Sequence, residues 1–253
     1  AVVSVGLGIK SGLYPFHYWI PDTYGYATPA ASAILSGLVS KGYIFLLIKI
    51  FYRVLGRENV VASHIVNVLF VFGIVGMIMG SLHAIAEKDT RRMIAYSSVA
   101  QIGYIYMGIG LGTQAGMVAA VFHIFTHSAT KALLFISAVG LYEASGNKKD
   151  YLSLRGAGYR NPLAGIGFGI GALSMVVFHM LAGFISKLLF ATSALQSPHK
   201  MFLTLIALAV STVLNAVYFL RLVLTLYRPA VSPEGHEVLE HAGGTKSSWN
   251  LRL

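Results

Sequence analysis

The chain has 253 residues, of which 56% are hydrophobic and only 11% are charged. Its mean hydropathy of +0.69 excludes an ordinary soluble domain and indicates a polytopic membrane protein. The net charge of +10 is no sign of a nucleic-acid partner, because the basic residues lie mostly in short segments between apolar runs, where they act as topology signals. Cysteine is absent, so disulfides, thiolate zinc sites and iron–sulfur ligation are excluded within the chain.

The first segments predict a partial span followed by a complete one. Ala1–Tyr14 reads as the end of a helix that stops near Pro15. Because it has neither an initiator Met nor a basic leader, we expect the chain to be the second half of a longer protein. Pro15–Thr28 is expected to be a loop whose Trp and Tyr side chains suit the membrane interface. Pro29–Tyr52 is the first complete span, and it carries Lys41 about 18 Å from its start, near the middle of the bilayer.

The later apolar runs alternate with polar segments, of which Arg53–Ser63, Glu87–Arg92 and Glu143–Asn161 are expected to be loops or turns. The run from 162 to 195 would measure about 51 Å as one straight helix, which exceeds a hydrocarbon core of about 30 Å. We therefore expect a break in it, close to Gly183 and before Lys187. The other predicted spans are His64–Ala86, Ile94–Gly112, Gln114–Leu141 and Met201–Tyr227.

The sequence thus predicts an all-α, polytopic transmembrane helix bundle with six full or broken spans after a partial N-terminal one. Residues 1–227 form the membrane domain, and residues 228–253 form a polar C-terminal tail. If the spans alternate, three basic residues lie on one side (Arg53, Arg57 and Lys200) and eight on the other, which is then cytoplasmic. These eight are Lys88, Arg91, Arg92, Lys148, Lys149, Arg155, Arg160 and Arg228.

One predicted helix carries a polar stripe in the sequence VFHIFTHSATKALL. His123, His127 and Lys131 recur every four residues and therefore share one helical face. Three interpretations are open: hydrogen bonds between helices, a metal site shared by the two histidines, and a relay of titratable groups. The cationic Lys131 opposes a metal ion, so we expect no metal or cofactor, and the relay fits best.

The distribution of charge supports a functional interpretation. All nine acidic residues fall in predicted loops or in the tail, whereas Lys10, Lys41, Lys131 and Lys187 fall in apolar segments. Four charged lysines in a membrane would cost on the order of 10 kcal/mol. Either burial makes them neutral part of the time, or a carboxylate from a missing N-terminal half or another subunit pairs with them.

Four ordered motifs carry a family resemblance: PFHYWIPDTYGYATPAASAILSGLVSKGY, EKDTRRMIAYSSVAQIGY, FHIFTHSATKALLF and GFISK. They resemble the antiporter-like proton-pumping subunits of respiratory complex I and the large subunits of Mrp-type sodium/proton antiporters. Membrane-bound hydrogenases use the same module. The resemblance implies two inverted five-helix repeats with flanking helices, around a hydrated axis along which protons pass.

The resemblance also implies roles for the individual residues. Lys10 matches a lysine on the first broken helix, Lys41 the lysine of the next helix, and Lys187 the lysine at the second broken helix. His123, His127 and Lys131 match the connecting relay. The family pairs the position of Lys10 with a glutamate on an early helix, which is expected in the missing half.

We therefore expect a multi-pass integral membrane protein, of a bacterial or archaeal cell membrane, that translocates protons through buried lysines and histidines. It would be a non-redox subunit that assembles with other membrane subunits of a complex I-like or Mrp-type complex. The alternative is a scaffold whose polar groups only pin the helices. Sodium/proton exchange ranks lower, because sodium prefers oxygen ligands and the spans offer no carboxylate.

Overall fold

The computed structural model describes residues 2–176, 181–231 and 237–238. Its helices form a bundle in which four, by length and composition, are able to cross a membrane: Pro29–Leu55, Ile65–Ala86, Gln114–Glu143 and Pro198–Leu226. The elements of the described part are α1 (Val2–Ser11), α2 (Trp19–Tyr26), α3 (Pro29–Ile34), η1 (Leu35–Val39), α4 (Ser40–Lys49), η2 (Ile50–Leu55), α5 (Arg57–Ala62), α6 (Ile65–Ala86), α7 (Thr90–Gly110), α8 (Gln114–Glu143), α9 (Ala157–Arg160), α10 (Pro162–Val176), α11 (Ala182–Ala194), α12 (Pro198–Leu226), β1 (Ala230–Val231) and β2 (Glu237–Val238).

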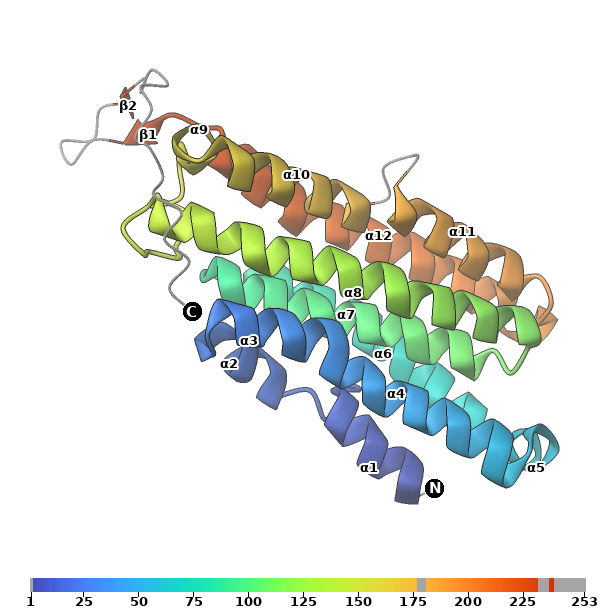
Figure 1. Cartoon of the computed structure of the whole chain (residues 1–253). Coiled ribbons are helices and arrows are strands. Elements are labelled where there is room, and N and C mark those ends of the chain that lie inside the picture. Colours follow the sequence, from blue (N-terminus) through green and yellow to red (C-terminus); the bar gives the residue numbers. More distant parts are fainter. Residues whose placement is uncertain (1, 177–180, 232–236, 239–253) are drawn as a thin grey trace.

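Helix α7 occupies the centre of the bundle, between α6 and α8 (Figure 1). The α1–α4 segment lies on one side, and α10–α12 lie on the other (Figure 1). Almost every residue of α7 is buried, and its side chains form much of the hydrophobic core. Asp89 starts the helix, because its side chain accepts hydrogen bonds from the backbone N–H groups of Arg91 and Arg92. At about 31 Å, α7 is long enough to cross the hydrocarbon core.

The first complete span is continuous but irregular. Thr28 caps it and Pro29 occupies its first turn, as is usual at helix starts. Two π-helical segments, η1 and η2, interrupt the α-helical pattern before the span ends at Gly56. A π-helical turn adds one residue to the turn and so rotates the side chains that follow.

The predicted break in the apolar run from 162 to 195 is confirmed. Helix α10 ends at Val176 and α11 begins at Ala182, while residues 177–180 lie outside the described part of the chain. Helix α1 likewise ends at Ser11, before Pro15, as predicted. Short helices therefore lie beside two of the predicted site residues: α1 packs against α4, which carries Lys41, and α10 packs against α11, which carries Lys187.

Several predicted loops contain helices. Pro15–Thr28 holds α2, whose Tyr24 is fully buried, and the indole Nε1 of Trp19 donates to the Ile9 carbonyl at 2.9 Å. Tyr18 and Tyr26 are 73% and 75% exposed, so a position of these two rings at the membrane interface stays a prediction. The prediction that every acidic residue lies in a loop or the tail is wrong for Asp22, Glu58 and Glu143, which belong to α2, α5 and α8. Arg53–Ser63 holds α5, and Glu143–Asn161 holds α9.

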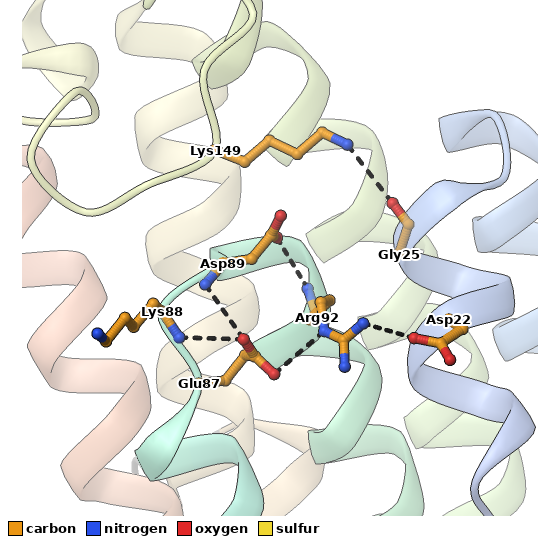
Figure 2. Close-up of polar contacts among 7 residues, drawn as sticks. All are labelled: Asp22, Gly25, Glu87, Lys88, Asp89, Arg92 and Lys149. Carbon is orange, nitrogen blue, oxygen red and sulfur yellow. Dashed lines mark hydrogen bonds and ion pairs between the residues drawn. The ribbon is translucent and has the colours of Figure 1, made fainter.

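The charged turn before α7 is tied to α2 by Arg92 (Figure 2). The guanidinium of Arg92 donates to Asp22 at 2.5 Å and to Glu87 at 3.1 Å. Lys149 reaches the Gly25 carbonyl at 3.5 Å from the long loop after α8 (Figure 2). Because Arg92 and Asp22 are partly exposed, these contacts fix the geometry of the turn more than they stabilise the protein.

Most of the basic residues assigned to one side do gather at one end of the bundle. The backbone N–H of Thr90 donates to the Lys149 carbonyl at 3.0 Å, and Arg160 donates to the Ala144 carbonyl at 2.8 Å. Arg91 differs from the other basic residues of this end, because it is buried and its guanidinium donates to the Ala27 carbonyl and the Ser32 hydroxyl. That this end faces the cytoplasm stays a prediction.

The predicted boundary at residue 227 follows the end of α12 at Leu226. Within the tail, β1 pairs antiparallel with β2, and residues 232–236 and 239–253 lie outside the described part. The division into a membrane domain and a separate tail stays a prediction.

Close packing of α6 on α7 depends on glycine, and this gives a first prediction. A Cβ at Gly103 would lie 2.6 Å from the Gly73 carbonyl oxygen and from the Met77 nitrogen. We expect Gly103→Ala to lower the free energy of unfolding by about 1–3 kcal/mol, even though alanine has a better helix propensity than glycine. The measurement is thermal unfolding in detergent. Gly42→Ala is the control, because nothing lies within 4 Å of its added Cβ. Equal losses of stability would contradict the close approach.

Candidate functional site

Five of the six residues predicted to form a proton relay lie in the interior of the bundle. They come from α4, α8 and α11. The exposed fractions are 2% for Lys41, 3% for His123, 1% for His127, 0% for Lys131 and 7% for Lys187. The every-fourth-residue stripe of α8 therefore faces inward, as its spacing predicts.

Lys10 is different, because the structure leaves it on an exposed face of α1. The buried face of that helix holds Ser4, Gly8 and Ser11. The Ser11 hydroxyl forms a 2.7 Å hydrogen bond with Tyr106 on α7, which anchors the end of α1 to the core. The structure does not bring Lys10 into the buried row, and its role and its acidic partner stay predictions.

Lys41 lies two residues after the end of the π-helical segment η1. In that segment the N–H of Ser40 donates to the Leu35 carbonyl five residues earlier. The Lys41 ammonium donates to the Ser36 carbonyl, also five residues earlier. The Ser36 hydroxyl bonds to Ser98 of α7 at 3.0 Å. The irregular turn thus supplies a carbonyl oxygen to a buried cation and ties it to the central helix.

Lys131 is held by α7. Its ammonium donates to the Ile94 carbonyl at 2.8 Å and to the Ser97 hydroxyl. The ammonium also lies 5.9 Å from the centre of the Phe219 ring, in a cation–π contact. Lys131 and Lys41 are near enough to interact electrostatically, so α4 and α8 bring two cations to one region.

The two histidines stack on each other. Their ring centres are 5.9 Å apart and their planes differ by only 5°. Nδ1 of His123 forms a 2.5 Å hydrogen bond with Ser186 of α11, and its ring stacks on Tyr104 at 5.5 Å. Among the described residues, Nε2 of His123 and both ring nitrogens of His127 are buried with no hydrogen-bond partner. Buried polar atoms of this kind require an explanation.

Lys187 lies where α10 is interrupted. Its ammonium donates to the carbonyl of Met175, in the last turn of α10, at 3.0 Å. The end of the described part of α10 thus supplies an acceptor for the buried cation. The ammonium also lies 5.5 Å from the centre of the Tyr104 ring.

A small cavity joins the histidines to Lys187. Its volume of about 10 Å³ is at the lower limit for one water molecule. Gln101 of α7 also lines it, and its side-chain nitrogen is buried with no partner among the described residues. Sequence reasoning missed Gln101, although a glutamine inside a predicted span was a usable signal. The full lining is Gln101, His123, Thr126, His127, Thr130, Ser174, Met175, Gly183 and Lys187.

A second polar cluster, also missed from the sequence, lies between α6 and α12. Tyr218 donates to the Asn215 side-chain oxygen at 2.6 Å, and Ser81 donates to the same oxygen at 3.3 Å. These groups are neutral and buried. They pin α12 to α6, and they add no charge to the row of lysines and histidines.

The row contains cations and imidazoles without acids. Within the described part of the chain, no ion pair involves Lys41, Lys131 or Lys187. The described residues also hold no group of three or more histidine, cysteine, aspartate or glutamate side chains that could bind a metal ion. The arrangement can therefore hold or pass protons, but it offers no metal centre in the part of the chain that the structure describes.

Comparison with known proteins identifies similar sequences. A family model described as "NADH:quinone oxidoreductase/Mrp antiporter, TM" matches residues 1–214. NADH-quinone oxidoreductase subunit N of Desulforudis audaxviator is 34% identical over 92% of this chain and 46% of its own length. Subunit M of Rickettsia prowazekii is 30% identical over 87% of this chain and 43% of its own length. The chain thus spans about half the length of the curated relatives it matches.

Two solved structures share the fold. The Mrp complex from Dietzia sp. DQ12-45-1b matches with a TM-score of 0.77 and 28% identity, over 93% of this chain and 41% of the other. The membrane-bound sulfane sulfur reductase, an archaeal respiratory membrane complex, matches with a TM-score of 0.80 and 29% identity, over 94% and 47%. The helix arrangement around the buried row is therefore shared with subunits of multisubunit membrane complexes.

The approach of α11 to α10 at the break can be tested directly. A Cβ at Gly183 would lie 1.8 Å from the Ser174 carbonyl oxygen, so Gly183→Ala must push the start of α11 away from α10. We expect it to lower the free energy of unfolding by about 1–3 kcal/mol in thermal unfolding. The control is Gly169→Ala on α10, because an added Cβ there meets nothing within 4 Å. If Gly183→Ala is no less stable than its control, the helices do not meet in this way.

Proposed function

The chain belongs to the NADH:quinone oxidoreductase/Mrp antiporter transmembrane family, and on this premise we propose that its buried lysines and histidines translocate protons across the membrane. The proposed path joins Lys41, His127, His123 and Lys187, with Lys131 beside the first step. Lysine and histidine suit this task, because histidine titrates near neutral pH and a buried lysine readily exchanges its proton.

The distances between the groups decide whether a proton can pass directly or needs a bridging water molecule. A proton passes between groups that are hydrogen-bonded at about 2.6–3.2 Å, or through one bridging water. The stacked imidazoles, with centres 5.9 Å apart, are too distant for direct exchange. Water in the cavity that both histidines share with Lys187 would complete the path. The cavity is lined by residues of both α10 and α11, on either side of the break.

Charge repulsion couples the groups of the path. Lys41 interacts electrostatically with both histidines and with Lys131, and Lys187 interacts with His123. A proton that arrives on one group raises the energy of protons on its neighbours and so favours their release, equally in both directions along the row. Because the described spans supply no carboxylate to neutralise these groups, the repulsion acts along the whole row.

The observation that carries the proposal is the unpartnered state of the histidine nitrogens. Three buried imidazole nitrogens, one on His123 and two on His127, have no protein partner among the described residues, and both rings line the cavity. If these histidines only held helices together, their ring nitrogens would be hydrogen-bonded to the neighbouring helices.

The contacts of the lysines favour the alternative, a scaffold that does not pump. Each buried lysine donates directly to a backbone carbonyl, at Ser36, Ile94 and Met175. The bonds of Lys131 and Lys187 join α8 to α7 and α11 to α10, as a scaffold would require. An ammonium has three donors, however, and the described hydrogen bonds use one at Lys41, one at Lys187 and two at Lys131. Donors remain for water, which is compatible with transfer.

We further propose that the chain works as a non-redox part of a larger assembly. Relatives with matching sequences are named as subunits of NADH-quinone oxidoreductase, and the similar structures are an Mrp complex and a membrane-bound sulfane sulfur reductase. Other membrane subunits are the expected partners, and an acidic group outside these 253 residues is the expected partner of Lys10. We propose a bacterial or archaeal cell membrane as the location.

Removal of either end of the path tests the proposal. Lys41→Met and Lys187→Met remove the titratable group and keep a side chain of similar length. In the assembled complex in vesicles, we expect proton translocation to fall by about a hundredfold, because a positioned proton-transfer group contributes at least that much. The measurement is acidification reported by a pH-sensitive dye, together with the amount of assembled complex.

Lys49→Met is the matched control, since Lys49 lies on the same helix as Lys41 but is exposed. It should translocate protons at the normal rate. The proposal fails if Lys41→Met and Lys187→Met assemble normally and pump at the rate of the control; in that case the scaffold is correct.

The dependence on sodium is a separate prediction. Sodium prefers several oxygen ligands, usually including a carboxylate, and the described buried row offers only neutral oxygens beside cations. We expect that replacing sodium with choline at constant ionic strength leaves the rate of proton translocation unchanged in the same vesicles. A rate of proton translocation that depends on sodium would contradict proton transfer alone.

A further inference from the structure

An apolar groove with a basic end runs along the outer face of α12. Its volume is about 710 Å³. One wall is a single stripe of α12, and the other comes from the loop between α8 and α9. The residues that line it are Tyr151, Leu152, Arg155, Val213, Ala216, Val217, Leu220, Arg221, Leu224, Thr225 and Arg228.

The apolar stripe of α12 faces away from the bundle. Val213, Val217 and Leu224 are 63%, 47% and 60% exposed, although they lie on a helix long and apolar enough to cross a membrane. From Val213 to Leu224 the stripe extends about 17 Å along the axis. The same exposed side chains line the groove.

The basic end of the groove lies at the level expected for lipid headgroups. Arg221 is about 7.5 Å before the end of α12, and Arg228 follows that end by two residues. The guanidinium of Arg221 lies 4.3 Å from the centre of the Tyr151 ring and donates to the Ile85 carbonyl at 3.3 Å. Arg221 is therefore held in place while its side chain stays exposed.

Nearby acidic side chains are engaged elsewhere. The described lining of the groove contains three arginines and no acidic residue. Glu87 pairs with Arg92 at 3.1 Å, and Asp89 caps α7. Asp150 accepts from the Ser153 N–H at 3.0 Å. Partial burial raises the pKa of Asp150, but this hydrogen bond and nearby Lys148 lower it overall, so it stays ionised on its own loop.

We propose that this groove binds an anionic phospholipid, with the phosphate between Arg155, Arg221 and Arg228 and an acyl chain along the α12 stripe. Guanidinium groups bind phosphate oxygens through paired N–H donors. Basic pockets at the end of transmembrane helices that face the cytoplasm bind anionic headgroups in this way. Charge complementarity selects the anionic headgroup, and the exposed apolar stripe selects a lipid over a soluble anion. The site does not depend on the proton path.

Photo-crosslinking in the native membrane tests this site with the full-length subunit in its complex. The probes are phosphatidylglycerol and phosphatidylcholine analogues that carry the same diazirine near the top of one acyl chain. Mass spectrometry of the digested subunit maps the labelled residues. We expect the anionic probe to label residues 213–224 in preference to the zwitterionic probe.

The double variant Arg221→Gln and Arg228→Gln should lose this labelling by about fivefold for each arginine removed. The matched control is Lys88→Gln with Lys148→Gln, which removes two exposed charges from the same end of the bundle outside the groove, and it should label normally. Equal labelling by both probes, or undiminished labelling of the arginine variant, would overturn the proposal. So would a lack of label on α12 from either probe, because the groove would then be covered by protein.

Discussion

Three ammonium groups lie inside a membrane-spanning bundle whose described residues bring them no carboxylate, and the rest of the site is arranged around this constraint. Each ammonium is met by a backbone carbonyl: that of Ser36 in a π-helical segment, that of Ile94 on the central helix, and that of Met175 in the last turn of α10. The Ser36 carbonyl belongs to a π-helical segment, where the helical hydrogen bonds are shifted by one residue, and the Met175 carbonyl lies at the end of the described part of α10. The π-helical segment and the end of α10 are therefore part of how the protein holds its buried lysines.

The central position of α7 explains how the row is held together. Its serines and its Gln101 face the lysines and the histidines, while Gly103 allows α6 to approach its backbone closely. Helix α7 thus presents polar side chains to the row of lysines and histidines, and a glycine to the close contact with α6. Because α7 is almost wholly buried among neighbouring helices, it does not need the uniform hydropathy of a span that faces lipid.

Much of the architecture was predictable from the sequence, because apolar runs of membrane length have one stable structure in lipid. The length of the run from 162 to 195 required a break, and the spacing of His123, His127 and Lys131 required one face. Other features depend on contacts that are distant in sequence. Helix α2 was missed because it is short and includes Pro21, which is tolerated in its first turn. The π-helical turn before Lys41 and the position of Gln101 follow from packing on α7 and α8, which no local pattern records.

The central claim is that the cavity beside the histidines conducts protons, and hydration is its most direct test. A cryo-electron microscopy map of the assembled complex, at a resolution that shows ordered water, would reveal how the unpartnered nitrogens of His123 and His127 are satisfied. We expect water molecules that join these nitrogens to Gln101 and Lys187 through the cavity. A dry, closed interior, in which the imidazole nitrogens and the lysine ammoniums bond only to protein atoms, would contradict it.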